Sequence, residues 1–127
     1  MNILAHGVDL VNVHRIAHSI EEYGERYLAR VFTEHERAYC EDRAKRRFEH
    51  YAVRFAAKEA ALKCLGTGWS KGISWTDVGV TNNINGAPEL TVVGVAGDFA
   101  RDLGVTGWFV SLSHTDDMAM ASVIAVG

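Results

Sequence analysis

The sequence predicts a single α+β domain spanning residues 1–127, in which a largely antiparallel sheet packs on one long central helix. Two observations lead to this fold class. Residues 47–65 carry the longest run of helical periodicity, whereas most strand-like segments follow residue 73. A length of 127 residues suits one domain with a hydrophobic core, and the chain contains no internal repeat.

The first part of the chain predicts a strand followed by a helix. Residues 3–10 are mostly apolar and are expected to form the strand. Residues 13–22 are expected to form the helix, because Asn12 can cap its first turn and Gly24 can end it.

Two further helices are predicted before residue 67. Thr33 and Glu36 fit a capping box, in which each side chain bonds to the other residue's backbone amide, so a helix should follow to about Glu41. The longest helix is expected at residues 47–65, where aromatic residues, alanines and leucines recur at helical spacing. Gly66 follows it, in the place where glycine commonly ends a helix.

The second half of the chain is expected to be rich in strands. Asn85-Gly86 is a good turn sequence, and residues 95–103 have the spacing of one more helix, which Gly104 would close. The expected strands are residues 73–81, 89–93, 107–113 and 118–126.

Composition restricts the location and the chemistry. No apolar run approaches the ~20 residues of a membrane helix, and the N-terminus lacks the pattern of a signal peptide, so we expect a cytoplasmic protein. Cys40 and Cys64 are not spaced as a metal or disulfide pair, and Cys64 falls among apolar helix residues. Both are expected to pack in the core, which argues against a thiol mechanism.

The charge is unevenly distributed along the chain. The net charge is −3, of which residues 1–63 contribute +1 and residues 64–127 contribute −4. A basic run at residues 43–47 follows arginines at 15, 26, 30 and 37. These residues form either a solvated face or a surface for phosphates or an acidic partner, and charge alone does not decide between the two. The acidic second half and the lack of a recognised motif argue against nucleic-acid binding.

Glu59 interrupts the apolar stripe of the long predicted helix. It lies four residues after Phe55 and seven after Ala52, so a carboxylate faces the buried side, where it needs a compensating partner. Lys63, four residues on, can supply an ion pair within the helix. The alternative is that Glu59 binds a cation.

Asp9 raises the same question at the end of the first strand. It can cap the next turn or helix, or it can share a hard cation with Glu59. Magnesium suits two carboxylates, because it keeps several waters and often binds substrate phosphates as well. Zinc does not suit this chain, since no cysteine or histidine pair has the right spacing.

Two further segments are candidates for ligand contact. Gly66-Thr67-Gly68 is either a helix stop or a place where a ligand approaches the backbone, and it is not a P-loop. His114 follows Ser111 and Ser113 at a predicted strand end, but no nucleophile elbow is present, which argues against a hydrolase.

Together these segments resemble one family, the holo-[acyl-carrier-protein] synthases, which are small phosphopantetheinyl transferases. The resemblance covers nearly the whole chain in the family's order. It is carried by Gly7-Val8-Asp9-Leu10 with Arg15-Ile16, by residues 30–36, by Arg54-Phe55-Ala56-Ala57-Lys58-Glu59-Ala60 continuing to Gly68, by residues 72–80 and 85–88, and by residues 111–115 and 119–124. One departure is Ala87, where family members usually have a lysine, so we assign no phosphate contact to that turn.

The resemblance implies the phosphopantetheinyl transferase fold and an activity. Phosphopantetheine would pass from coenzyme A to a serine of an apo acyl carrier protein, with release of adenosine 3′,5′-bisphosphate. It implies Mg²⁺ held by Asp9 and Glu59, catalysis by these two residues with Lys63, and coenzyme A contacts at Arg54, Lys58, Lys63, Gly66, Thr67, Gly68 and His114. Arg54 and Lys58 also fit a solvated basic face equally well.

The resemblance also implies partners. Carrier proteins are acidic, and Arg15, Arg26 and Arg30 are the candidate contacts. A homotrimer with active sites between subunits is implied, in which His114 would serve a neighbour's Asp9 and Glu59. The competing interpretation is a non-catalytic module that binds coenzyme A or another pyrophosphate nucleotide, which leaves the Asp9–Glu59 pair without a use.

Overall fold

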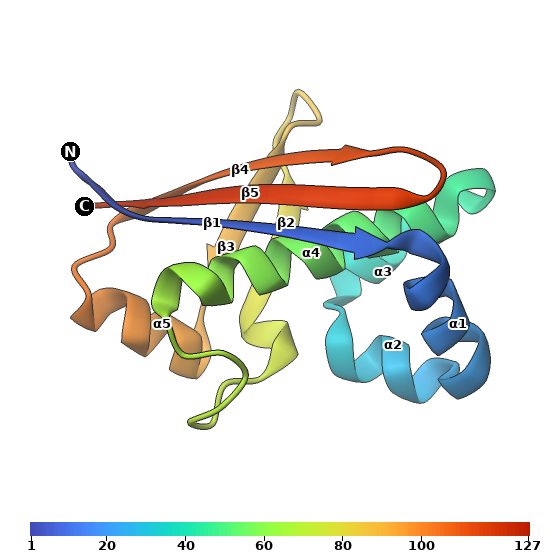
Figure 1. Cartoon of the computed structure of the whole chain (residues 1–127), viewed down its shortest axis with the longest axis horizontal. Coiled ribbons are helices and arrows are strands. Elements are labelled where there is room, and N and C mark those ends of the chain that lie inside the picture. Colours follow the sequence, from blue (N-terminus) through green and yellow to red (C-terminus); the bar gives the residue numbers. More distant parts are fainter.

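The computed structural model describes residues 1–127 and has the α+β architecture that the sequence predicts (Figure 1). Five α-helices and five strands alternate irregularly along the chain. The helices are α1 (Val13–Tyr23), α2 (Glu25–Val31), α3 (Glu34–Glu41), α4 (Arg47–Leu65) and α5 (Gly94–Asp102). The strands are β1 (Ile3–Asn12), β2 (Val78–Asn82), β3 (Pro88–Val92), β4 (Gly107–His114) and β5 (Met118–Val126).

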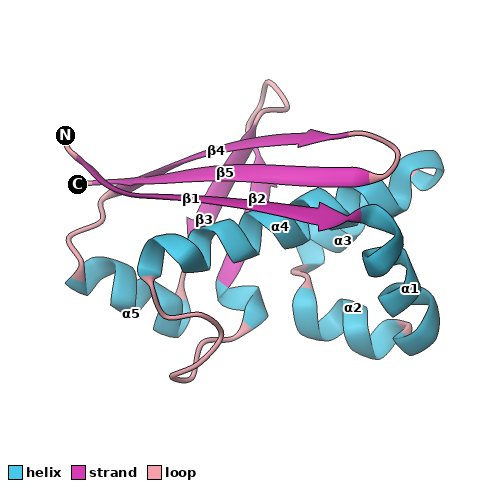
Figure 2. Ribbon diagram, viewed as in Figure 1, coloured by secondary structure: helices cyan, strands magenta, loops and turns pink.

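The larger sheet lies along α4 and joins the two ends of the chain. Its strand order is β1-β5-β4 and both pairings are antiparallel, so the last strand lies between the first strand and β4. Alternation along β5 turns small residues such as Ala121 and Val123 toward α4, where they are fully buried. Figure 2 shows this sheet extended over the helix, with the smaller sheet behind it.

Helix α4 is buried on several sides at once. β1 and β5 cover one side, while α1, α3 and β2 contact others. Its alanines at 52, 56, 57, 60 and 61 are fully buried, and such small side chains let neighbouring backbones approach closely. A helix covered in this way forms the centre of the hydrophobic core.

Several local signals are confirmed. The Asn12 side chain accepts a hydrogen bond from the backbone N–H of His14, which caps α1. Thr33 and Glu36 form the predicted capping box at the start of α3. Gly66 ends α4 in the left-handed conformation that favours glycine.

Three expectations about the elements need correction. The strands form two sheets rather than one, because β2 and β3 pair only with each other. The strand expected at residues 73–81 begins only at Val78, since Ser74 and Asp77 close a capping box around a short 3-10 turn, Trp75–Asp77. Helix α2 was not predicted; it starts directly after Gly24, so this glycine separates two helices.

A buried ion pair joins α3, α4 and the smaller sheet. Lys58 Nζ lies 2.8 Å from Glu36 Oε1, and both side chains are fully buried. The lysine also donates to the Val78 carbonyl, and the other Glu36 oxygen accepts from the Val80 backbone N–H at 2.8 Å. Burial lowers the pKa of Lys58, and the neighbouring Glu36 charge opposes that shift.

Both cysteines lie in the interior, as expected. Cys40 and Cys64 are free and buried, and burial raises the pKa of the Cys40 thiol to about 12. A thiol so strongly protonated at neutral pH is a poor nucleophile. Among the helices, none combines the length and the apolar character that crossing a bilayer requires.

We expect Lys58→Met to destabilise the protein by about 3–5 kcal/mol, because it leaves the Glu36 carboxylate buried without its cation. Urea unfolding followed by circular dichroism measures this change. The matched control is Arg101→Met, which removes an exposed ion pair with Asp98 on α5 and should cost about 1 kcal/mol or less. Equal effects of the two substitutions would contradict a structural role for the buried pair.

Candidate functional site

The site is built where β1 crosses α4. At Gly7 the strand backbone lies so close to the helix that an added Cβ would be 2.1 Å from the Ala60 carbonyl oxygen. Only glycine fits such an approach. Alternation then turns Asp9, two residues on, toward the same helix, and its side chain is 18% exposed.

Lys63 connects the strand to the helix. Its Nζ donates to the Val8 carbonyl at 2.7 Å and lies 3.3 Å from Asp9 Oδ1. The side chain is 54% exposed, so the ammonium borders open solvent. Asp9 therefore pairs with Lys63 and does not cap α1, which Asn12 caps instead.

Glu59 lies one helical turn before Lys63 but does not pair with it. Its Oε1 accepts a hydrogen bond from the Trp69 indole N–H at 3.1 Å, and no cation lies within ion-pair distance of its carboxylate. Of the two alternatives for Glu59, the intrahelical pair with Lys63 is therefore wrong. Residues four apart share a helix face, so Glu59, Lys63 and Asp9 gather in one region.

The loop after α4 folds back beside this region. Gly66 and Gly68 both have positive φ angles, and open space surrounds the position of an added Cβ at either one. Thr67 Oγ donates to the Gly68 carbonyl at 3.0 Å. The glycines thus form a turn whose backbone a ligand can approach.

A second group of residues lines a cavity at another side of α4. Arg54 and His114, both predicted from the sequence, line a cavity of about 190 Å³ together with His50, Asn82 and Pro88, among others. Arg54 Nε and His114 Nδ1 are buried there and lack hydrogen-bond partners. The nearest carboxylate oxygen of Glu49 is 3.7 Å from His114, too far for a hydrogen bond.

The electrostatics of this cavity suit an anion. Arg54 Nε is a buried donor without a partner, and His114 Nδ1 is a second one in the tautomer that protonates it, so an anion that accepts from both would be stabilised. The pKa of His50 is lowered, first by burial and then by the positive charge of Arg54. Burial and the Arg54 charge therefore both disfavour the protonated form of His50.

The sequence pattern did not predict how deeply Arg54 and Lys58 are buried. A solvated basic face was one expectation, yet Arg54 is 2% exposed and Lys58 is fully buried. Arg54 reaches the cavity, whereas Lys58 is occupied by Glu36 and by backbone carbonyls. Burial and pairing give Lys58 a structural role, and its contact with coenzyme A stays a prediction.

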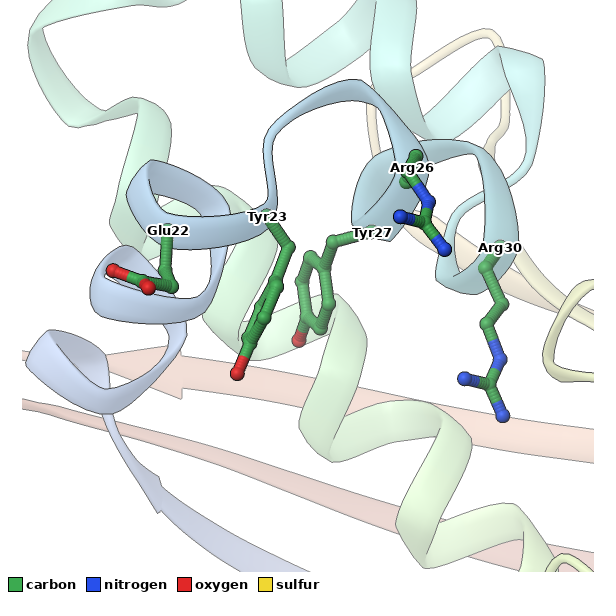
Figure 3. Close-up of a pocket in the computed structure, with 5 residues that line it drawn as sticks. All are labelled: Glu22, Tyr23, Arg26, Tyr27 and Arg30. Atoms are coloured by element: carbon green, nitrogen blue, oxygen red, sulfur yellow. The ribbon is translucent and has the colours of Figure 1, made fainter.

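The arginines of the first half divide into free and paired groups. Arg15, Arg26 and Arg30 are exposed and form no ion pair, whereas Arg37 pairs with Glu25 at 2.5 Å. Figure 3 shows Arg26 and Arg30 projecting to the same side of α2, beside the rings of Tyr23 and Tyr27. Arg30 also lines a second hollow with Trp69, so the basic surface continues toward the loop that contacts Glu59.

The basic run at residues 43–47 forms ion pairs and a ring contact with residues nearby in the chain. Arg47 Nε lies 2.8 Å from Glu41, and Arg46 pairs with Glu49 across three residues. The Arg43 guanidinium stacks over the Tyr39 ring at 3.6 Å. These contacts fit the interpretation of the run as a surface face.

Sequence reasoning missed Trp69, His50 and Asn82. Trp69 follows a glycine turn, and nothing in the periodicity indicates that the loop returns to the helix. His50 and His114 lie edge to face with ring centroids 5.7 Å apart, although 64 positions separate them. His50 does carry a signal, because it lies four residues before Arg54 and so shares its helix face.

Comparison with known proteins gives a consistent result. Residues 5–123 match the family model of the 4′-phosphopantetheinyl transferase superfamily. A holo-[acyl-carrier-protein] synthase of Desulforudis audaxviator is 51% identical over 126 residues, which cover 98% of this chain and 94% of that protein.

Solved structures agree in fold. The holo-[acyl-carrier-protein] synthase of Neisseria meningitidis superposes with a TM-score of 0.86 at 29% identity, covering 99% of this chain and all of the other. The Bacillus anthracis holo-(acyl-carrier-protein) synthase, solved in complex with CoA (3′,5′-ADP), has a TM-score of 0.78 at 31% identity over 97% of this chain and 96% of its own. With the motifs and the geometry, these matches show that the chain belongs to the 4′-phosphopantetheinyl transferase superfamily.

Proposed function

We propose that the protein is a holo-[acyl-carrier-protein] synthase, which transfers 4′-phosphopantetheine from coenzyme A to a serine of apo acyl carrier protein. The observation that carries this proposal is the gathering of Asp9, Glu59 and Lys63 at the crossing of β1 and α4. Relatives with the same name match nearly the whole chain, and the B. anthracis relative was solved with CoA.

The donor set fits a magnesium ion. Glu59 carries no competing cation, and Asp9 reaches the same region through its contact with Lys63. The chain has no cluster of three or more His, Cys, Asp or Glu side chains that would hold a metal alone. Two carboxylates that leave positions for water and substrate phosphates are what magnesium prefers. When bound, the ion would neutralise charge on the pyrophosphate of coenzyme A.

The residues of the chain then have separate tasks. The serine oxygen of the carrier forms a bond to the β-phosphorus of coenzyme A, and the bond to the bridging oxygen breaks. Adenosine 3′,5′-bisphosphate leaves with that oxygen, while the serine proton passes to Glu59 directly or through a water that Glu59 orients. Lys63, half exposed beside Asp9, meets the phosphate charge.

The Arg54–His114 cavity would hold another part of coenzyme A. At about 190 Å³ it is smaller than a site for a whole ligand of this size, so it takes one end, such as a phosphate. Arg54 and Glu59 are five residues apart on α4, which places them about 140° apart around the helix. One coenzyme A molecule therefore reaches both most simply when the two residues come from different subunits.

The outer face of the larger sheet suits an interface between the subunits of a homotrimer. Leu10 and Met120 are cross-strand neighbours there, 62% and 42% exposed, and Phe109 opposite Ile124 is 55% exposed. Apolar side chains exposed together mark a surface that a partner covers. β1 is an edge strand of this sheet and turns Asp9 toward α4, so a subunit that extends past this edge would lie near Asp9.

The acidic carrier would dock on Arg15, Arg26 and Arg30. These arginines have no acidic partners within the chain, and Arg30 continues toward Trp69 and Glu59. A cytoplasmic location fits the two free cysteines, because disulfides are rare in that reducing compartment.

Glu59→Gln should lower kcat/KM at least about a hundredfold without unfolding the protein, because it weakens both the metal site and the proton acceptor. Mass spectrometry of an apo carrier incubated with coenzyme A, Mg²⁺ and enzyme measures the adduct. Glu89→Gln, an exposed glutamate on β3, is the matched control.

EDTA should stop the same reaction. An adduct that forms at the wild-type rate with Glu59→Gln would remove Glu59 from the site, and activity in EDTA would exclude the metal. Coenzyme A binding without any adduct on several carriers would instead indicate the non-catalytic binding module.

Arg26→Ala and Arg30→Ala should each raise the KM for the carrier several-fold and leave the dissociation constant of coenzyme A unchanged. The increase should shrink at high salt, because exposed charges are screened. Steady-state kinetics at two ionic strengths, with Arg101→Ala on α5 as control, measure both effects. An unchanged KM in both variants would place the carrier elsewhere.

Mixing Glu59→Gln subunits with His114→Ala subunits should restore activity that neither variant has alone. If each site takes Glu59 from one subunit and His114 from its neighbour, random mixing makes up to roughly a quarter of the sites complete. Sedimentation measures the oligomeric state, which we expect to be a trimer, and mass spectrometry measures whether the subunits have exchanged. Exchange without recovered activity would show that the two residues act within one chain.

A further inference from the structure

Trp69 makes the one side-chain hydrogen bond that the Glu59 carboxylate accepts. Its indole N–H donates to Oε1 at 3.1 Å. We propose that Trp69 is a positioning residue that fixes this oxygen and so leaves Oε2 free for the cation. The proposal rests on the proposed function, in which Glu59 is a magnesium ligand.

An aromatic column holds the indole in place. Trp69 stacks on Trp75 with ring centroids 3.7 Å apart and planes 25° apart. Trp75 in turn stacks on Phe55 at 5.1 Å and 27°. Phe55 is four residues before Glu59 on the same helix, so the column starts on α4 and returns to α4 one turn further on.

The buried Lys58 helps to fix Trp75, the middle ring of the column. Lys58 Nζ reaches the Trp75 carbonyl at 3.4 Å and also donates to the Val78 carbonyl. The Ser74–Asp77 capping box fixes the short turn that carries Trp75. Trp75 therefore has little freedom, and its stack limits the freedom of Trp69.

The loop of residues 66–72 has the backbone conformations that bring the chain back to α4. Gly66, Gly68, Lys71 and Gly72 all have positive φ angles, so the chain reverses within a few residues of the end of α4. For Lys71 this conformation is uncommon, since its side chain crowds the backbone there. A loop that keeps such a residue is held by contacts elsewhere, and the tryptophan stack is such a contact.

The physical effect is preorganisation. A free glutamate side chain rotates about three torsions, and ordering it costs conformational entropy. The indole bond orders Glu59 before any ligand arrives. Partners that orient metal ligands in this way typically contribute about 10–100-fold to metal affinity.

The test is Mn²⁺ binding in the presence of coenzyme A, followed by electron paramagnetic resonance of the free ion. Mn²⁺ serves as the probe because it accepts the same oxygen ligands as Mg²⁺. Trp69→Phe keeps a ring for stacking but removes the N–H, and we expect it to weaken Mn²⁺ binding by about tenfold or more. Trp108→Phe, a tryptophan on β4 that packs against the core elsewhere, should bind Mn²⁺ like the wild type.

Glu59→Gln separates the two hypotheses. If this variant loses Mn²⁺ while Trp69→Phe binds it like the wild type, the positioning role of Trp69 is overturned and the proposed function stands. If Glu59→Gln binds Mn²⁺ like the wild type, Glu59 is not a metal ligand. The metal site of the proposed function is then wrong, and the role of Trp69 that depends on it is wrong as well.

A measurement on the unsubstituted indole covers the case in which Trp69→Phe does not fold. The indole proton of Trp69 should exchange with solvent more slowly than that of Trp108, and nuclear magnetic resonance measures both rates. The protection should persist when Mg²⁺ and coenzyme A are added and should be lost in Glu59→Ala, which has no acceptor for the indole N–H. Protection that disappears on adding Mg²⁺ and coenzyme A would overturn the proposal.

Discussion

The site depends on one close contact between a strand and a helix. At Gly7 the backbone of β1 rests against the carbonyl of Ala60, leaving no room for a side chain on the strand. This contact sets the depth at which β1 crosses α4, and it thereby brings Asp9 to Lys63. A bulkier residue at Gly7 would move the strand outward and separate the two parts of the proposed metal site.

Around this contact, α4 serves different purposes on different sides. Glu59 and Lys63 face β1 and the returning loop, Arg54 faces a small cavity, and Lys58 is buried against the smaller sheet. Because successive helical residues point about 100° apart, the adjacent Lys58 and Glu59 can have opposite roles, one structural and one proposed to be catalytic. The rigidity of the buried side supports the geometry of the reactive side.

Structural features set by neighbouring residues could be predicted from the sequence, and contacts between distant residues could not. The Thr33–Glu36 capping box and the stop at Gly66 depend on neighbouring residues, so their patterns predicted them. The carboxylate of Glu59 stood out because it broke an apolar stripe. The burial of Lys58 depends on a second sheet that covers its face, and the Trp69 contact depends on a loop that reverses direction. Neither leaves a periodic signal, since each is set by residues distant along the chain or by an irregular backbone.

The order of the strands has a consequence for how the molecule forms. β1, which carries Asp9, pairs only with β5, so residues 3–12 find their partner in residues 118–126 at the far end of the chain. During synthesis the first strand must wait, with its apolar side chains uncovered, until residues 118–126 have emerged from the ribosome. Pairing over such a separation is slow because the long loop must close first. The proposed metal site is therefore among the last features to assemble, and a nascent or truncated chain without β5 cannot display it.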